Sequence, residues 1–296
     1  MLIYLKLLAT MAFWGGTFIA GRMLAGVVPP FSAAFLRFAV AGLLLMLLLY
    51  RYEGRFPRFN RRELGAVLLL GLTGVVGYNL AFFKGLETVS AGRAGLIIAL
   101  NPVGIALVSA LFDGEPLRPV KSLGILLSVV GAMLVISDGQ LALLFSKMTE
   151  GELVLLGCVL CWSLYSVIGR RVMGTLTPLA AVTGSAVIGA LMLAPLALAQ
   201  GVVPAALGYG TKAWCGLLYL AALGTVVAFF WYYQSIREIG AVRAGVFINF
   251  VPLFALLFGF LLLGEPLTAG LVKGGVLVIL GAWITNNNGL RPKFSS

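Results

Sequence analysis

Long apolar stretches separated by short polar breaks dominate the chain. Each stretch approaches the roughly 20 residues that cross the hydrocarbon core of a bilayer as a helix. Polar or Pro-containing segments such as Val28-Pro29-Pro30 and Thr175-Leu176-Thr177-Pro178 divide them. The pattern predicts ten membrane-spanning helices, over residues 3–25, 31–50, 64–83, 91–112, 119–137, 151–169, 178–199, 213–234, 241–263 and 269–286.

The second half of the chain repeats the first at a nearly fixed distance. Residues 64–137 and 214–287 share 20 identical residues in 74 positions at a constant shift of 150. Nine of the identities fall at Gly, Pro or charged sites, among them Arg93 and Arg243, Pro102 and Pro252, and those within the Gly-Glu-Pro-Leu runs at 114–117 and 264–267. Such a pattern indicates an internal duplication rather than chance apolar similarity. In each run the carboxylate, Glu115 or Glu265, is available for a nearby helix N-terminus or an Arg.

Each copy of the duplication holds five predicted helices. Trp14 and Arg22 match Trp162 and Arg170 at a shift of 148, so we interpret the first apolar stretch as a membrane span and not as a cleaved signal peptide. Because five is odd, the second copy must enter the membrane from the opposite side. The expected fold is an all-α integral membrane protein with ten transmembrane helices in two inverted five-helix repeats around a central cavity.

Composition and charge agree with a membrane protein and give it an orientation. Hydrophobic residues make up 61% of the chain and charged residues only 10%, far from the balance of a soluble domain. The net charge of +11 comes from Lys and Arg near the edges of the spans, with Arg37 left near the second span. A cytoplasmic N-terminus places most of them inside, so both termini are expected in the cytoplasm. The loops are too short for a nucleic-acid-binding module.

Several motifs resemble EamA domains of the drug/metabolite transporter superfamily. They are Phe13-Trp14-Gly15-Gly16-Thr17-Phe18, Leu36-Arg37-Phe38, Ala91-Gly92-Arg93-Ala94-Gly95-Leu96 and the doubled Gly-Glu-Pro-Leu. The resemblance covers essentially the whole chain as two tandem domains, 1–138 and 150–288, and is strongest to the YddG type of amino-acid exporter. It implies a multi-pass protein of the bacterial inner (plasma) membrane that carries small metabolites by alternating access. The direction of export rests on this resemblance alone.

Polar and aromatic residues at mid-span mark the candidate substrate site, because polar groups cost free energy inside a bilayer. Asn101 immediately precedes Pro102, and Asn249 lies three residues before Pro252. Both prolines are expected to kink their helices or serve as hinges. The predicted substrate-binding residues are Trp14, Thr17, Tyr78, Asn79, Asn101, Trp162, Ser163, Ser166 and Asn249. Helix-to-helix hydrogen bonding by the Asn side chains and simple packing of the aromatic rings are the alternatives.

Several residue types are absent from the centres of the spans, and their absence restricts the kinds of site that the protein can contain. The chain has no His, and none of its ten acidic residues lies near the centre of a span. A buried proton relay and an intramembrane enzyme are therefore not expected, and no residue is assigned a catalytic role. No Arg or Lys pair stands out deep in the spans, so we expect a cavity that is polar yet uncharged. Cys158 and Cys161 lie within an apolar span, which argues against a metal site. No cofactor is expected.

A polar, uncharged cavity suits a zwitterion, whose two charges can meet helix ends, amides and carbonyl groups freed at helix breaks. We therefore expect a secondary transporter that exports amino acids, namely hydrophobic, aromatic and other neutral ones. Efflux of drugs or other small metabolites and flipping of lipids are the alternatives. The expected partners are a small-molecule substrate and the lipid bilayer. A monomer is expected, because one chain already carries both repeats.

Overall fold

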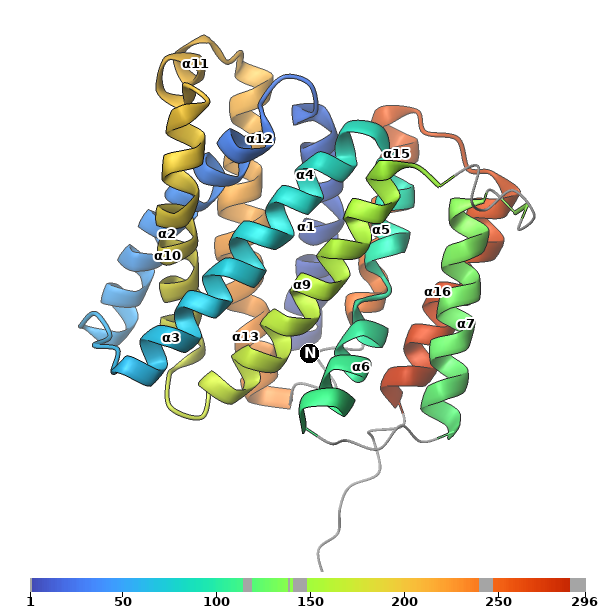
Figure 1. The fold of residues 1–296 in the computed structure, drawn as a ribbon, viewed down its shortest axis with the longest axis horizontal. Coiled ribbons are helices and arrows are strands. Elements are labelled where there is room, and N and C mark those ends of the chain that lie inside the picture. Colours follow the sequence, from blue (N-terminus) through green and yellow to red (C-terminus); the bar gives the residue numbers. More distant parts are fainter. Residues whose placement is uncertain (1, 114–118, 138, 141–147, 240–246, 288–296) are drawn as a thin grey trace, which may run out of the picture.

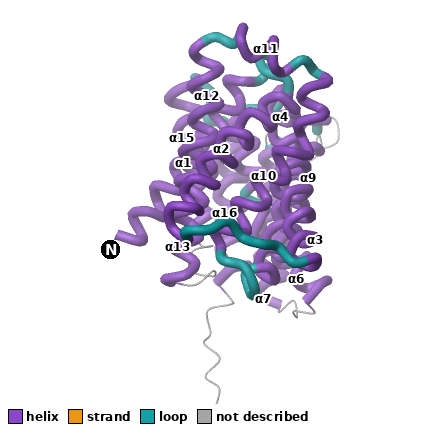
Figure 2. Tube along the Cα trace, turned by 90° about the vertical axis from the view of Figure 1, so that its left-hand side faces the viewer, coloured by secondary structure: helices purple, strands orange, loops and turns teal. Residues whose placement is uncertain are grey.

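Helices joined by short connections make up the described chain (Figure 1). The computed structural model describes residues 2–113, 119–137, 139–140, 148–239 and 247–287, and these ranges contain no strand (Figure 2). The α-helices are α1 (Leu2–Leu24), α2 (Pro30–Glu53), α3 (Arg61–Leu70), α4 (Tyr78–Thr88), α5 (Ala91–Ile98), α6 (Asn101–Asp113), α7 (Pro119–Ile136), α9 (Glu150–Val172), α10 (Pro178–Ala199), α11 (Val202–Gly208), α12 (Thr211–Ala221), α13 (Ala228–Ile239), α15 (Val251–Leu263) and α16 (Ala269–Asn287).

Seven helical segments of the described chain are long and apolar enough to cross a membrane. They are Leu2–Leu24, Pro30–Glu53, Arg61–Thr88, Ala91–Phe112, Glu150–Val172, Pro178–Ala199 and Thr211–Tyr232. The three other predicted spans coincide with shorter apolar helices, Ser122–Val135, Phe247–Leu263 and Ala269–Gly281. The all-helical fold expected from the sequence is thus confirmed for the described residues. The number of ten crossings and the inversion of the repeats stay predictions.

The two copies of the duplication interlock through their first helices. Helix α1 packs against α12, α13 and α15 of the second copy, and α9 packs against α3, α4 and α6 of the first. Figure 1 shows α9 lying along α4 and α6. Leu7, Met11 and Leu155 are fully buried at these contacts. In lipid, such contacts stabilise the fold mainly by close van der Waals packing.

Glycines permit the closest helix contact, between α7 and α16. These two helices lie side by side at the right-hand edge of Figure 1. A Cβ placed on Gly131 would lie 2.6 Å from the Val278 nitrogen, and one placed on Gly274 would lie 2.7 Å from the Gly131 oxygen. Only a residue without a side chain allows the backbones to approach so closely. Because both glycines belong to the duplicated set, this contact explains why the copies retain them.

Related helices of the two copies carry the same irregularities. The π-helical segment η1 (Gly71–Gly77) joins α3 to α4, and η3 (Ala222–Val227) joins α12 to α13 at the corresponding positions. The chain also leaves the α-helix between α5 and α6, and the 3₁₀ segment η4 (Phe247–Phe250) precedes α15. Irregular backbone at membrane depth is tolerated where it is buried in protein or lines a cavity.

Both prolines predicted as hinges follow these irregular segments directly. Pro102 lies in the first turn of α6, and Pro252 lies in the first turn of α15. A helix tolerates proline there, because the first backbone N–H groups have no partner within the helix. The helix is therefore interrupted just before each proline rather than bent at it, and the hinge role stays a prediction.

Candidate functional site

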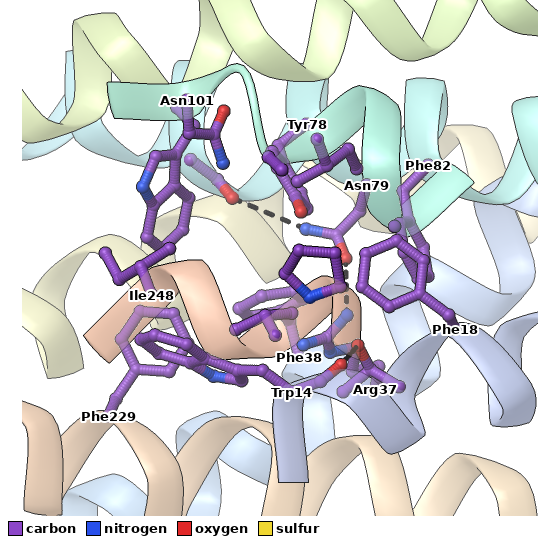
Figure 3. Close-up of a pocket in the computed structure, with 18 residues that line it drawn as sticks. Trp14, Phe18, Arg37, Phe38, Tyr78, Asn79, Phe82, Asn101, Phe229 and Ile248 are labelled. Atoms are coloured by element: carbon purple, nitrogen blue, oxygen red, sulfur yellow. Dashed lines mark hydrogen bonds between the residues drawn. The ribbon is translucent and has the colours of Figure 1, made fainter. Parts of the chain in front are cut away.

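A small cavity lies at the centre of the molecule, where helices of both copies meet. Its volume of about 60 Å³ leaves room for only a few water molecules. The lining residues are Trp14, Thr17, Phe18, Arg37, Phe38, Gly74, Tyr78, Asn79, Phe82, Gly95, Ile98, Ala99, Asn101, Trp162, Phe229, Ile248, Val251 and Pro252. Figure 3 shows these side chains converging from several helices.

Aromatic rings form one wall of the cavity. The Trp14 and Trp162 ring centroids lie 6.1 Å apart in an edge-on arrangement, and Phe229 lies 5.6 Å from Trp14 and 6.0 Å from Trp162. Tyr78 continues the wall, 5.5 Å from Trp162 and stacked on Phe82 at 6.0 Å. Separations and tilts of this kind are the favoured ones for aromatic pairs. The rings offer an apolar surface that also attracts cations through the ring faces.

Arg37 brings a positive charge into the cavity. Its side chain is only 6% exposed, and it lies about two turns from the start of α2. The Nε group donates to Thr225 Oγ1 at 3.1 Å. Nη1 donates to Asn79 Oδ1 at 2.9 Å, as Figure 3 shows. The guanidinium carbon also lies 5.2 Å from the centroid of the Phe38 ring. The prediction of an uncharged cavity was wrong.

The π-helical segments position both hydrogen-bond acceptors of Arg37. Asn79 follows η1 directly and donates through Nδ2 to the Val75 oxygen at 2.8 Å. Thr225 lies within η3 and donates through Oγ1 to the Leu220 oxygen, five residues earlier, at 2.8 Å. These bonds use the donors of both side chains, so their oxygen atoms are free to accept from the guanidinium. The Arg37 guanidinium thus has one hydrogen-bond acceptor from each copy.

Trp14 is fixed by the same backbone. Its Nε1 donates to the Gly224 oxygen of η3 at 3.2 Å. Thr17, one turn later, donates to the Trp14 oxygen at 2.6 Å, so its hydroxyl is satisfied within α1. The indole therefore has a defined orientation in the cavity wall, which a free-standing aromatic ring would lack.

The structure brings together many of the residues predicted for the site. Trp14, Thr17, Tyr78, Asn79, Asn101 and Trp162 line the cavity. Ser163 and Ser166 are outside the described lining, because each hydroxyl donates to a carbonyl four residues earlier in α9, at 2.6 and 2.7 Å. A serine can satisfy itself on its own helix in this way. Their role in substrate binding stays a prediction.

Two predicted amides are buried without complete hydrogen bonding. Asn101 lines the cavity, and its Oδ1 has no partner among the described residues. Asn249, in η4, is 6% exposed and lies outside the described lining, with both side-chain polar atoms unpaired. A buried polar atom left unpaired costs about 1–3 kcal/mol. Both positions are thus able to accept new partners, but their role in binding stays a prediction.

Arg37, Phe18, Phe38, Phe229 and Ile248 were missed by the sequence analysis. Charge counting grouped Arg37 with the basic residues near the membrane edges. Its position in the sequence held the signal, since it lies several residues inside an apolar stretch, where a charge is costly and usually has a function. The Phe and Ile side chains had no such signal, because apolar residues occur throughout every span.

A larger vestibule of about 880 Å³ lies beside the central cavity. Glu53, Arg55 and Thr177 place it at the end of the molecule where the α2–α3 and α9–α10 connections lie, the lower end in Figure 1. Thr177 donates to Glu53 there at 2.6 Å. Phe229 lines both spaces, so this ring is part of the wall between them.

Polar contacts join the helices at the opposite end. Glu265 accepts from the Ala91 and Gly92 nitrogens at the start of α5, at 2.7 and 2.9 Å. Arg93 forms an ion pair of 2.9 Å with Glu152, which is 3% exposed on the side chain. The expectation that Glu265 meets a helix N-terminus is confirmed, whereas Glu115 lies outside the described residues. Within the described ranges, no group of three or more His, Cys, Asp or Glu could hold a metal ion.

Several known proteins are similar to this chain in sequence along most of its length. The Bacillus subtilis protein named uncharacterized transporter YyaM is 31% identical over 99% of this chain and 96% of its own length. An uncharacterized transporter of Archaeoglobus fulgidus is 28% identical, with 95% and 97% covered. A WAT1-related chloroplastic protein of Arabidopsis thaliana is 26% identical over 95% of this chain and 68% of its own length.

A solved crystal structure superposes on the described fold with a TM-score of 0.69. It is 22% identical and covers 98% of this chain and 99% of its own, which shows that the fold is shared. Residues 1–137 and 149–287 each match the EamA-like transporter family. Together with the apolar helices, these matches show a multi-pass membrane transporter. The chain belongs to the EamA-like transporter family.

Proposed function

We propose that the protein is a secondary transporter that exports amino acids, namely hydrophobic, aromatic and other neutral ones, by alternating access. The central cavity carries this proposal. Its lining combines the rings of Trp14, Tyr78 and Trp162 with the amides of Asn79 and Asn101 and the cation of Arg37. Apolar walls with a few convergent polar groups are typical of small-molecule sites. Such a lining suits a substrate with an apolar side chain and a charged backbone.

Alternating access requires a closed end and an open end, and the two ends of the described molecule differ in this respect. The vestibule occupies one end, whereas the Glu265 and Arg93 contacts join helices at the other. The central cavity is too small for an aromatic amino acid, so binding requires the helices to move apart. The interrupted helices before Pro102 and Pro252 are the proposed hinges.

The proposed architecture is ten transmembrane helices in two inverted repeats, 1–138 and 150–288. The α2–α3 and α9–α10 connections lie at one end of the molecule, and the α1–α2 and α10–α11 connections lie at the other (Figure 1). The arginines at 51, 55, 58, 61 and 62 belong to the first of these ends. Their concentration supports a cytoplasmic assignment for it, in a bacterial inner membrane with both termini inside.

Efflux of drugs or other small metabolites is the second candidate function. The vestibule is walled by apolar side chains of α2, α10 and α13, including Leu45, Val182 and Phe230, which suit an apolar compound without a backbone charge. Arg37 in the inner cavity favours the amino-acid proposal, because an uncharged drug gains nothing from a buried guanidinium.

Flux through purified protein in sealed liposomes tests the proposal. Labelled Trp, Phe, Met, Thr, Lys and Glu are loaded separately, and exchange is followed with and without an imposed pH gradient. We expect saturable flux of the neutral amino acids above protein-free liposomes, insensitive to the gradient because the spans offer no His or central carboxylate. Absence of flux for all six would contradict the amino-acid proposal, and strong acceleration by the gradient would reveal a proton site.

A further inference from the structure

We propose that Arg37 is the anchor for a substrate carboxylate, so that the central cavity selects organic acids and zwitterions over amines. The inference rests on the proposed transport function for its physiological meaning, but the binding chemistry can be tested separately. Four observations carry it: the burial of Arg37, its lack of a carboxylate partner, its place in the cavity lining and the way its neighbours hold it.

Arg37 is a buried cation without a described anionic partner. Its side chain is 6% exposed, and its hydrogen-bond acceptors are the neutral oxygens of Asn79 and Thr225. The ion pairs found among the described residues join Lys84 to Glu87 and Arg93 to Glu152, both outside the cavity lining. A buried charge is costly unless it is paired. The neutral acceptors offset only part of this cost. Binding of an anion to Arg37 is therefore expected to be favourable in free energy.

The guanidinium also has donors left for a substrate. Five N–H groups are available on an arginine, and hydrogen bonds to side-chain acceptors use Nε and Nη1. Nη2 has no acceptor among the described residues. A carboxylate accepts two parallel N–H groups from an arginine, which gives both affinity and a fixed orientation. A phosphate ester could accept from the same donors. Its larger negative charge fits less well than that of a carboxylate in a cavity lined mainly by apolar rings.

The surrounding residues define where the rest of the substrate lies. In Figure 3, Asn101 lies at the upper left and Arg37 at the lower right, with Tyr78 at the top of the view and Trp14 at the bottom. A carboxylate on Arg37 therefore directs the remainder of the molecule along the aromatic wall. An ammonium group at the far end of the substrate meets ring faces of the aromatic wall. A carboxylate at that end would be out of reach of the Arg37 donors.

The decisive experiment compares two probes that differ only in charge group. Protein in lipid nanodiscs is titrated with labelled 3-phenylpropionate, which has a carboxylate and no amine, and with labelled 2-phenylethylamine, which has an amine and no carboxylate. We expect the carboxylate to bind about tenfold or more tightly than the amine, because a bidentate arginine pair is among the strongest hydrogen-bonded contacts. Equal binding, tighter binding of the amine, or binding of neither probe would overturn the proposal.

Substitutions of Arg37 test whether this residue causes the preference for the carboxylate probe. Arg37→Gln should weaken 3-phenylpropionate about tenfold or more and leave 2-phenylethylamine unchanged, and Arg37→Lys should recover part of the loss, since lysine keeps the charge without the planar fork. Arg22→Gln is the matched control, because Arg22 donates to the Leu86 and Glu87 carbonyls outside the cavity. Equal weakening of both probes by Arg37→Gln would contradict an anion anchor. If that variant fails to fold, the comparison on the unmodified protein decides.

The two proposals fail in different ways. Probe binding that depends on Arg37, without amino-acid flux in liposomes, would retain the carboxylate site and reject the amino-acid substrate. Amino-acid flux that is unchanged in Arg37→Gln would retain the transport function and reject the anchor.

Discussion

The contact between α7 and α16 and the central cavity use the duplication in opposite ways. At the helix contact both copies place the same residue at the same position, so Gly131 faces the backbone of α16 and its counterpart Gly281 faces that of α7. In the cavity, identical pairs such as Trp14 and Trp162 lie beside corresponding positions that differ. Asn79 of the first copy corresponds to Phe229 of the second at a shift of 150, and both line the cavity.

The backbone irregularity was retained while the side chains diverged. Both copies have a π-helical segment at corresponding positions, yet Thr225 in η3 corresponds to Val75 in η1. A packing contact between two related helices is satisfied by identical residues. One guanidinium, and one substrate without symmetry, need different groups from the two sides. The divergence at Asn79 and at Thr225 therefore gives Arg37 one acceptor from each copy.

The largest effect is expected where the copies are alike. Gly131→Leu and Gly274→Leu should each lower the free energy of unfolding by about 3 kcal/mol or more, because a side chain there overlaps the backbone of the facing helix. Thermal unfolding in detergent measures the loss. Gly65→Leu is the matched control, since a Cβ on Gly65 would meet nothing within 4 Å. Wild-type stability of both variants would show that the helices lie further apart than described.

Substitutions of the corresponding residues Trp14 and Trp162 should differ in their effect on transport, because the two indoles differ in hydrogen bonding. Trp162→Ala and Trp14→Ala should both reduce transport about tenfold or more with normal membrane insertion, a loss that corresponds to about 1.4 kcal/mol of binding. Conversion to Phe should affect Trp14 more, because it alone of the pair donates to the Gly224 oxygen in the described structure. Initial rates in liposomes give the comparison, and near-normal rates of both Ala variants would remove these residues from the site.

Thr225 offers a smaller test of the divergence between the π-helical segments. Thr225→Val preserves shape but removes an acceptor from Arg37, so it should cost about 1.5–3 kcal/mol of unfolding free energy. Thr73→Val in η1 is the control, because the half-buried Thr73 donates to the Leu69 oxygen one turn earlier and not to Arg37. Equal effects of the two substitutions would mean that the Arg37 contact contributes nothing.

The smallest effect is expected at Glu265. Glu265→Gln keeps one acceptor oxygen for the α5 N-terminus but loses the charge, which should cost about 0.3–1 kcal/mol. The melting temperature of the variant, measured beside that of Glu265→Ala, would show whether capping or charge dominates. A loss as large as that of the Ala variant would mean that charge alone accounts for the contact.

Hydropathy and the duplication predicted the helical membrane fold, because each span must satisfy its backbone internally and remain apolar. Polarity at mid-span located Asn79 and Asn101 correctly within the cavity lining. The same rule selected Ser163 and Ser166, which lie outside the described lining with hydroxyls that turn back onto α9, and their role in binding stays a prediction. Choice of rotamer decides that outcome, and the sequence does not specify it.

Arg37 was missed for a different reason. A basic residue near a span was attributed to the membrane edge, although its distance from the end of α2 makes it a buried group. Its contacts also depend on η1 and η3, and nothing in the residues 71–77 or 222–227 distinguishes a π-helix from an ordinary helical turn. The geometry that holds the cation arises from tertiary packing.

The crossed packing of α1 determines when the protein completes its fold during synthesis. Helix α1 enters the membrane first, but its neighbours α12, α13 and α15 are synthesised late, as far along the chain as Leu263. Until then α1 has native contacts mainly with α4 and α5 of the first copy, such as that of Phe18 with Phe82, and the rest of its buried face meets lipid or temporary partners. Native contacts of such long sequence separation form slowly. A chain terminated after the first copy would therefore leave its own first helix without the partners that the complete protein provides.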